Sequence, residues 1–196
     1  MNDLPNATPN PYDSGQAARP DTAGRAKRPI GTLILAAIFL LSGLWVGGQR
    51  CYQLISVFSS GDNVVIHPSF YVAMTRDIVT SATALLGAIG LLLGQTFGWW
   101  LSLMHAYWRL SIQGLLPLLG AMAAQSSPDA SSQSNPISAA LIASFIFLLN
   151  VLYLQKKAVL FYFGANVRRA IVNAVLLVSC LGIAFGLDVW WAVTQR

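Results

Sequence analysis

Residues 30–48 read IGTLILAAIFLLSGLWVGG, an apolar stretch without a single charged side chain. An α-helix needs about 20 such residues to cross a hydrocarbon core of ~30 Å, so this stretch has the length of a membrane span. Four further apolar stretches of similar character follow it along the chain. Together they predict an all-α, multi-pass transmembrane bundle of five spans, at residues 30–48, 78–94, 99–121, 137–154 and 170–193.

The composition supports a membrane protein. Of the 196 residues, 55% are hydrophobic and 10% are charged, whereas a soluble domain carries about 25% charged residues. The net charge of +5 does not indicate nucleic acid, because the basic residues flank apolar stretches, where they anchor a span against lipid headgroups. The expected partners are therefore the lipid bilayer and other membrane subunits or a second copy of the chain, and no nucleic acid.

The distribution of Lys and Arg predicts the orientation. Residues 1–29 contain five prolines and few large apolar side chains, so we expect a disordered cytoplasmic tail. With that tail inside, the cytoplasmic segments carry eight basic residues and the external segments three, while Arg109 lies within a span. The positive-inside rule then predicts a cytoplasmic N-terminus and, after five spans, an external C-terminus.

Two connections and the two cysteines complete the expected topology. Residues 49–77 are expected to form a long external loop with amphiphilic stretches in the interface plane. Residues 95–98 are so few that the second and third spans must form an antiparallel hairpin. Cys51 and Cys180 are expected at different depths, so they cannot bring their Cα atoms within the ~7 Å of a disulfide. We expect two free thiols and no metal site.

The third predicted span holds the most unusual polar residues. His105, Arg109 and Gln113 are spaced i, i+4 and i+8, which places them on one face of a helix. A central Arg costs at least ~2.5–3.5 kcal/mol on insertion scales, so we expect it to face the bundle or a wet cavity. This intramembrane polar seam has two interpretations: a structural one, in which Arg109 bonds carbonyls or snorkels, and a functional one, as a polar pathway or anion site loosened by Pro117.

Other residues are expected to hold the helices together. Asn150 and Asn173 lie near the cytoplasmic ends of their spans, where an amide is typical of interhelical polar glue. Three glycine pairs have the small-xxx-small spacing that lets helix backbones approach closely, either within the bundle or in an oligomer. These pairs are Gly43 and Gly47, Gly90 and Gly94, and Gly182 and Gly186.

Three short motifs resemble one family. Arg28-Pro29-Ile30-Gly31 leads into the first span, GQTFGWW ends in a Trp pair at 94–100, and LNVLYLQKKAVLFYF occupies 149–163. Residues 28–164 thus resemble small, uncharacterised bacterial four-span membrane proteins with an RPxG motif before the first span. The chain departs from them in lacking basic residues before the Trp pair and in adding a fifth span. The resemblance implies a topology and a bacterial inner-membrane location, but no chemistry.

The motifs of enzymes are missing from the sequence. It contains no His-Glu-x-x-His, Gly-x-Ser-x-Gly, Walker lysine or dinucleotide motif. We therefore expect a non-enzymatic accessory or scaffold subunit without a cofactor. One alternative is a small channel or transporter around Arg109, although no internal repeat supports it. A second alternative is a pigment- or haem-associated subunit that uses His105, the one histidine within a predicted span.

Overall fold

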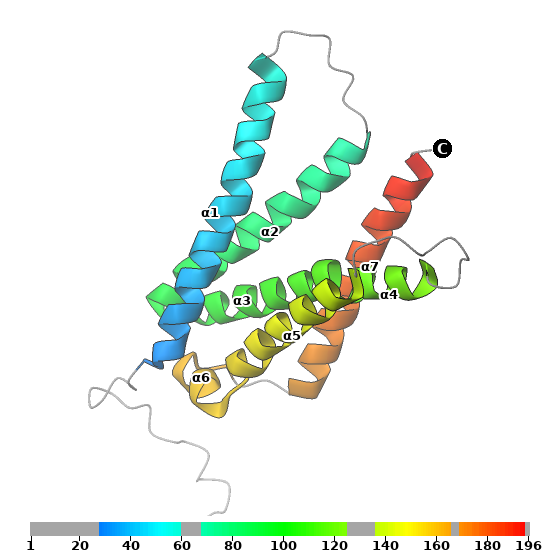
Figure 1. Cartoon of the computed structure of the whole chain (residues 1–196). Coiled ribbons are helices and arrows are strands. Elements are labelled where there is room, and N and C mark those ends of the chain that lie inside the picture. Colours follow the sequence, from blue (N-terminus) through cyan, green and yellow to red (C-terminus); the bar gives the residue numbers. More distant parts are fainter. Residues whose placement is uncertain (1–27, 60–67, 125–135, 166–168, 195–196) are drawn as a thin grey trace, which may run out of the picture.

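The computed structural model describes residues 28–59, 68–124, 136–165 and 169–194. Every element in these ranges is a helix (Figure 1), which confirms the predicted all-α fold. The predicted tail lies outside the described residues, apart from its last two positions. The helices are α1 (Ile30–Ser59), α2 (Pro68–Leu93), α3 (Thr96–Arg109), the π-helix η2 (Leu110–Leu115), α4 (Leu116–Ala124), α5 (Pro136–Leu154), α6 (Lys157–Tyr162) and α7 (Arg169–Thr194).

Four of the described helices, α1, α2, α5 and α7, are long and apolar enough to cross a membrane. They support a membrane location for the chain. Their outer faces carry large apolar side chains, such as Phe145 at 62% exposure and Val178 at 69%, which is the surface that lipid requires and water penalises. The predicted span at 99–121 is instead divided into consecutive helices of 14, 6 and 9 residues.

The segment predicted as an external loop, residues 49–77, is helical over most of its length. Helix α1 continues to Ser59, and α2 already begins at Pro68. The amphiphilic stretch CYQLISVF therefore belongs to the continuous helix α1 rather than to a loop. Hydropathy falls where a helix leaves the hydrocarbon, but its backbone hydrogen bonds continue beyond that point. Pro68 suits a first helical turn, because its missing N–H has no intrahelical acceptor there.

The expected antiparallel hairpin between α2 and α3 is present. Gly94 has a left-handed backbone, with φ of 68°, and ends α2 in a Schellman motif. In this motif the Gln95 N–H donates to the Gly90 carbonyl at 3.0 Å, and the Gly94 N–H donates to Leu91 at 3.2 Å. Helix α3 begins at Thr96, so the two helices run back along each other. Gly90 and Gly98 bring their backbones into direct contact near this turn.

A π-helix separates α3 from α4 immediately before a proline. Pro117 lacks the N–H that would donate to the Gln113 carbonyl, and its ring would collide with that carbonyl in a regular α-helix. Gln113 belongs to η2, which runs from Leu110 to Leu115, so the wider π-helical turns contain the carbonyl that the proline ring would strike. Gly114 of η2 packs against Ser144 of α5, so the widened segment also brings two helices close together.

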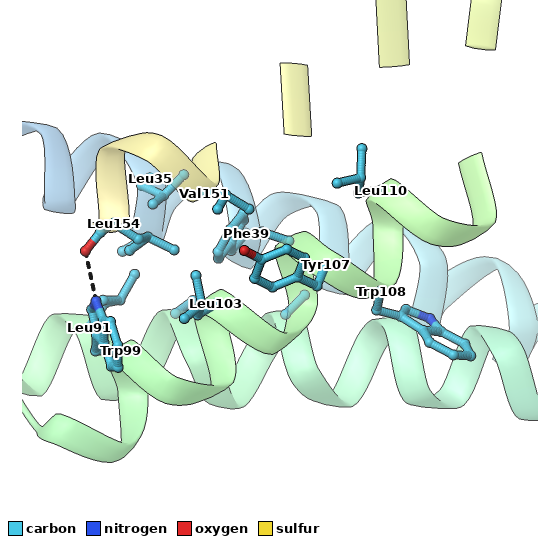
Figure 2. Close-up of a cluster of buried hydrophobic side chains, with 14 of the residues drawn as sticks. Leu35, Phe39, Leu91, Trp99, Leu103, Tyr107, Trp108, Leu110, Val151 and Leu154 are labelled. Atoms are coloured by element: carbon cyan, nitrogen blue, oxygen red, sulfur yellow. Dashed lines mark hydrogen bonds between the residues drawn. The ribbon is translucent and has the colours of Figure 1, made fainter. Parts of the chain in front are cut away.

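Helix α3 lies at the centre of the packing, against α2, α5 and α7. In Figure 1 it crosses the splayed α1 and α7 obliquely, and Figure 2 shows its buried side chains Trp99 and Leu103 beneath residues of α1 and α5. The Trp99 indole donates to the Leu154 carbonyl at 2.8 Å. Helix α6 closes the same end, because the Thr96 hydroxyl donates to the Phe163 carbonyl at 2.7 Å.

Candidate functional site

His105 is enclosed between α1, α2 and α3. His105 is 1% exposed, and its Nδ1 atom lies 3.1 Å from the Thr83 hydroxyl. The Phe39 ring packs edge-on against the imidazole, with 4.8 Å between the two ring centroids. A macrocycle ligated by His105 would have to displace these neighbours. The arrangement suits a histidine that ties α2 to α3 better than one that carries a pigment or haem.

A second polar pair continues this contact along the same two helices. The Trp108 indole N–H donates to the Thr80 hydroxyl at 2.9 Å. Thr80 and Thr83 are three residues apart on α2, as Trp108 and His105 are on α3, so antiparallel packing brings the two faces together in register. Nothing in the sequence pattern singles out these threonines, because Thr is common in apolar helices, where it can bond to its own backbone.

Arg109 follows one turn further along α3 and is half-buried. Its Nε atom is buried without a hydrogen-bond partner. The guanidinium carbon lies 5.4 Å from the centroid of the Phe147 ring of α5, a cation–π distance. Arg109 therefore faces its neighbouring helices with part of its hydrogen-bonding capacity unused.

Arg109 and Gln113 line one pocket, and His105 lies apart from them. The three residues were expected on one helical face, but His105 is buried, Arg109 is half-buried and Gln113 is exposed. Helix α3 is regular between His105 and Arg109, so the difference lies in their positions along the bundle. Phe39 of α1 and Thr83 of α2 cover His105, whereas Arg109 and Gln113 lie beside the pocket. The structure thus places Arg109 and Gln113 at one pocket, whereas His105 contacts Thr83 instead.

The pocket has a volume of about 220 Å³. Two ion pairs frame it: Arg50 of α1 with Asp77 of α2, and Arg76 of α2 with Asp188 of α7 at 3.0 Å. Sequence reasoning treated Arg50 and Arg76 only as markers of topology. Their position within one helical turn of the apolar stretches was the available signal, since helices continue past the hydrocarbon. The lining residues are Arg50, Ala73, Arg76, Asp77, Arg109, Ile112 and Gln113.

The two asparagines differ in their surroundings. The Asn173 amide of α7 donates to the Gln155 side-chain oxygen at 2.9 Å, and Gln155 donates in return, so these two amides form a reciprocal pair. Gln155 was not singled out in the sequence. Asn150 is half-buried on α5 and does not belong to this pair.

The glycine pairs also divide into two groups. A Cβ at Gly43 would meet Leu85 at 2.7 Å, and one at Gly47 would meet Ser81 at 2.7 Å, so both positions lie at the α1–α2 contact. Gly90 lies against Gly98, and Gly94 is the left-handed residue in the turn between α2 and α3. Around Gly182 and Gly186 of α7, in contrast, no described atom comes within 4 Å of an added Cβ.

The thiols and the donor groups offer no metal centre within the described ranges. Cys51 is exposed and Cys180 is buried, and both are free. No group of three or more His, Cys, Asp or Glu side chains gathers among the described residues.

No family model, no curated protein and no solved structure matches this chain. The resemblance to bacterial four-span proteins, which rests on the motifs around Arg28, Trp99 and Tyr153, therefore stays a prediction.

Proposed function

We propose that the chain is a non-enzymatic accessory or scaffold subunit, and that α7 carries its contact with a partner. One observation supports this most directly. The small-xxx-small glycines of α1 and α2 are used in contacts within the chain, whereas Gly182 and Gly186 remain open among the described residues. Small residues in apolar helices let a second helix approach closely, and lipid alone gives them no role.

The polar groups of the bundle also support a structural role. Thr83 with His105, Thr80 with Trp108, and Asn173 with Gln155 are spent on contacts between helices. A transport pathway needs a continuous series of polar groups from one side of the membrane to the other. The enclosed His105, one turn before Arg109 on α3, interrupts such a series. This pattern favours a structural role over conduction.

We further propose a bacterial inner-membrane location with five crossings, a cytoplasmic N-terminus and an external C-terminus. The excess of basic residues on alternate connections supports the orientation. Antiparallel pairing supports the fifth crossing, because α3 and η2 follow α2 from Gly98 beside Gly90 to Ile112 beside Arg76 and Asp77. At 1.5 Å per residue this shared path is about 21 Å, and α4 extends it.

Purification in a mild detergent tests the subunit proposal. The wild-type chain should elute with a partner, or a second copy of itself, at fixed stoichiometry. Gly182→Leu should abolish this association because the larger side chain prevents close approach. Gly120→Leu is the matched control, since Gly120 of α4 also has no described atom near an added Cβ. A wild-type chain that elutes alone, or equal retention by both variants, would contradict the proposal.

The pocket beside Arg109 favours a second candidate, a small channel or transporter. Arg109→Leu separates it from the first. A transporter should lose its flux in reconstituted vesicles while the variant still inserts and assembles. An accessory subunit should show no flux in either form, and Arg109→Leu should then alter only helix packing or partner retention.

A further inference from the structure

We propose that the pocket between α1, α2 and the α3–η2 junction binds a phosphate group. Arg50, Arg76 and Arg109 come from three different helices and line one pocket of about 220 Å³. That space admits a phosphate together with ordered water, each molecule of which takes about 30 Å³. This inference goes beyond the proposed subunit role, because it requires no partner protein.

The charges around the pocket do not cancel. Asp77 is the one carboxylate among the lining residues, and it pairs with Arg50. Asp188 of α7 pairs with Arg76 from outside the lining. Within the described ranges this assigns both aspartates to other arginines and leaves Arg109 without an ion pair. The cluster therefore keeps an excess of one positive charge.

Arg109 carries that excess in the least favourable place. It is half-buried in a helix of the bundle, and its Nε is buried without an acceptor. Its described stabilising interactions are the face of the Phe147 ring and the charge of Asp77, which Arg109 shares with Arg50. An arginine in such surroundings is costly unless an anion or water compensates it. A bound anion would supply both the missing acceptor and the missing charge.

The donor geometry favours phosphate over a simple halide. A guanidinium presents a planar fork of N–H donors that matches two oxygens of a phosphate, and several such forks can share its tetrahedral oxygens. Gln113 adds an amide to the same wall, which can donate to one oxygen or accept from a protonated one. Because Arg50 follows the apolar stretch by only two residues, a lipid headgroup and a free phosphate both have access.

Binding measurements on the full-length chain test the proposal, with Arg109→Gln and Arg50→Gln as test variants. The first arm titrates inorganic phosphate into protein in detergent and follows the melting temperature. The second arm measures retention of phosphatidylglycerol, against neutral lipid, by native mass spectrometry from nanodiscs. Lys157→Gln is the matched control, since it removes one positive charge from an exposed side chain of α6, at the opposite end of the bundle (Figure 1).

The two arms distinguish the source of the phosphate. Loss of one charged contact should weaken binding by roughly tenfold or more. A phosphate-dependent shift that Lys157→Gln retains and both test variants lose supports a free phosphate. Selective loss of phosphatidylglycerol from the test variants supports a headgroup. If Arg109→Gln does not fold, Arg50→Gln decides alone, because its side chain is about one-third exposed. Equal binding by control and test variants in both arms would overturn the proposal.

Discussion

At the scale of single residues, the buried hydrogen bonds of α2 and α3 should carry measurable stability. Thr80→Val keeps the shape of the side chain but leaves the Trp108 N–H without its acceptor. We expect a loss of about 0.5–2 kcal/mol in the free energy of unfolding, since membrane hydrogen bonds are worth less than an isolated unsatisfied donor suggests. Unfolding in mixed detergent micelles measures it.

The control for this change is Thr75→Val. Thr75 is exposed on the same helix, and within the described ranges its hydroxyl bonds to the Tyr71 carbonyl of its own preceding turn. Its replacement should leave stability within about 0.5 kcal/mol of the wild type. Equal losses in the two variants would show that the contact between helices contributes nothing.

Single residues also show what the sequence could and could not predict about the site. A charged or ionisable side chain inside an apolar stretch is conspicuous, so His105 and Arg109 were found. Their partners were not, because Thr83 and Phe147 are ordinary residues of such helices. Arg50 and Arg76 were expected in a loop, but both lie within helices, since hydropathy marks the end of the hydrocarbon and not the end of the helix.

At the scale of elements, the α2–α3 hairpin should tolerate almost no added volume at its closest point. Gly90→Ala would place a Cβ against the backbone of Gly98. We expect about 1–3 kcal/mol of destabilisation, the usual cost of overpacking, and a wider spacing of the two helices. Spin labels on α2 and α3 report that spacing, and micelle unfolding reports the stability.

Gly120→Ala provides the comparison for this variant. It also replaces a helical glycine, but no described atom lies near its added Cβ. We expect no loss, and a small gain is consistent with the better helix propensity of Ala. A hairpin that accepts alanine at Gly90 as readily as α4 does at Gly120 would argue against the close contact.

The elements themselves were predicted unevenly, for a physical reason. Apolar runs identify which segments prefer lipid, so α5 and α7 were placed within a residue or two of their ends. The π-helix was not predicted as such. Pro117 announces a disturbed turn, but whether the backbone kinks, breaks or widens depends on what packs beside it, here Ser144 of α5.

At the scale of the whole molecule, the proposed orientation can be read from the two native thiols. Cys51 is exposed near the far end of α1, and Cys180 is buried. A membrane-impermeant maleimide should therefore label the wild type in intact spheroplasts, and Cys51→Ser should remove the signal. Labelling that requires lysis would place Cys51 inside and reverse the orientation.

The order of packing was beyond the sequence. In lipid, apolar side chains gain little by meeting each other rather than acyl chains, so periodicity does not reveal which face turns inward. The central place of α3 depends on particular bonds, such as that from the Trp99 indole to the Leu154 carbonyl (Figure 2). Such bonds have no regular spacing along the chain.

The two ends of the bundle are fastened by different forces, and this makes them respond differently to ionic strength. Around the α2–α3 turn, donors bond to carbonyls without forming ion pairs, as the neutral Trp99 and Thr96 do and as the Arg28 guanidinium does to Leu91. At the opposite end the helices are joined by half-exposed ion pairs, Arg50 with Asp77 and Arg76 with Asp188. Salt screens exposed charges over about 8 Å at 0.15 M and about 3 Å at 1 M, and leaves such carbonyl bonds almost untouched. Raising the salt should therefore speed amide hydrogen exchange near Arg50 and Arg76 and leave it unchanged near Thr96. The helices would then separate first at the end that carries the ion pairs.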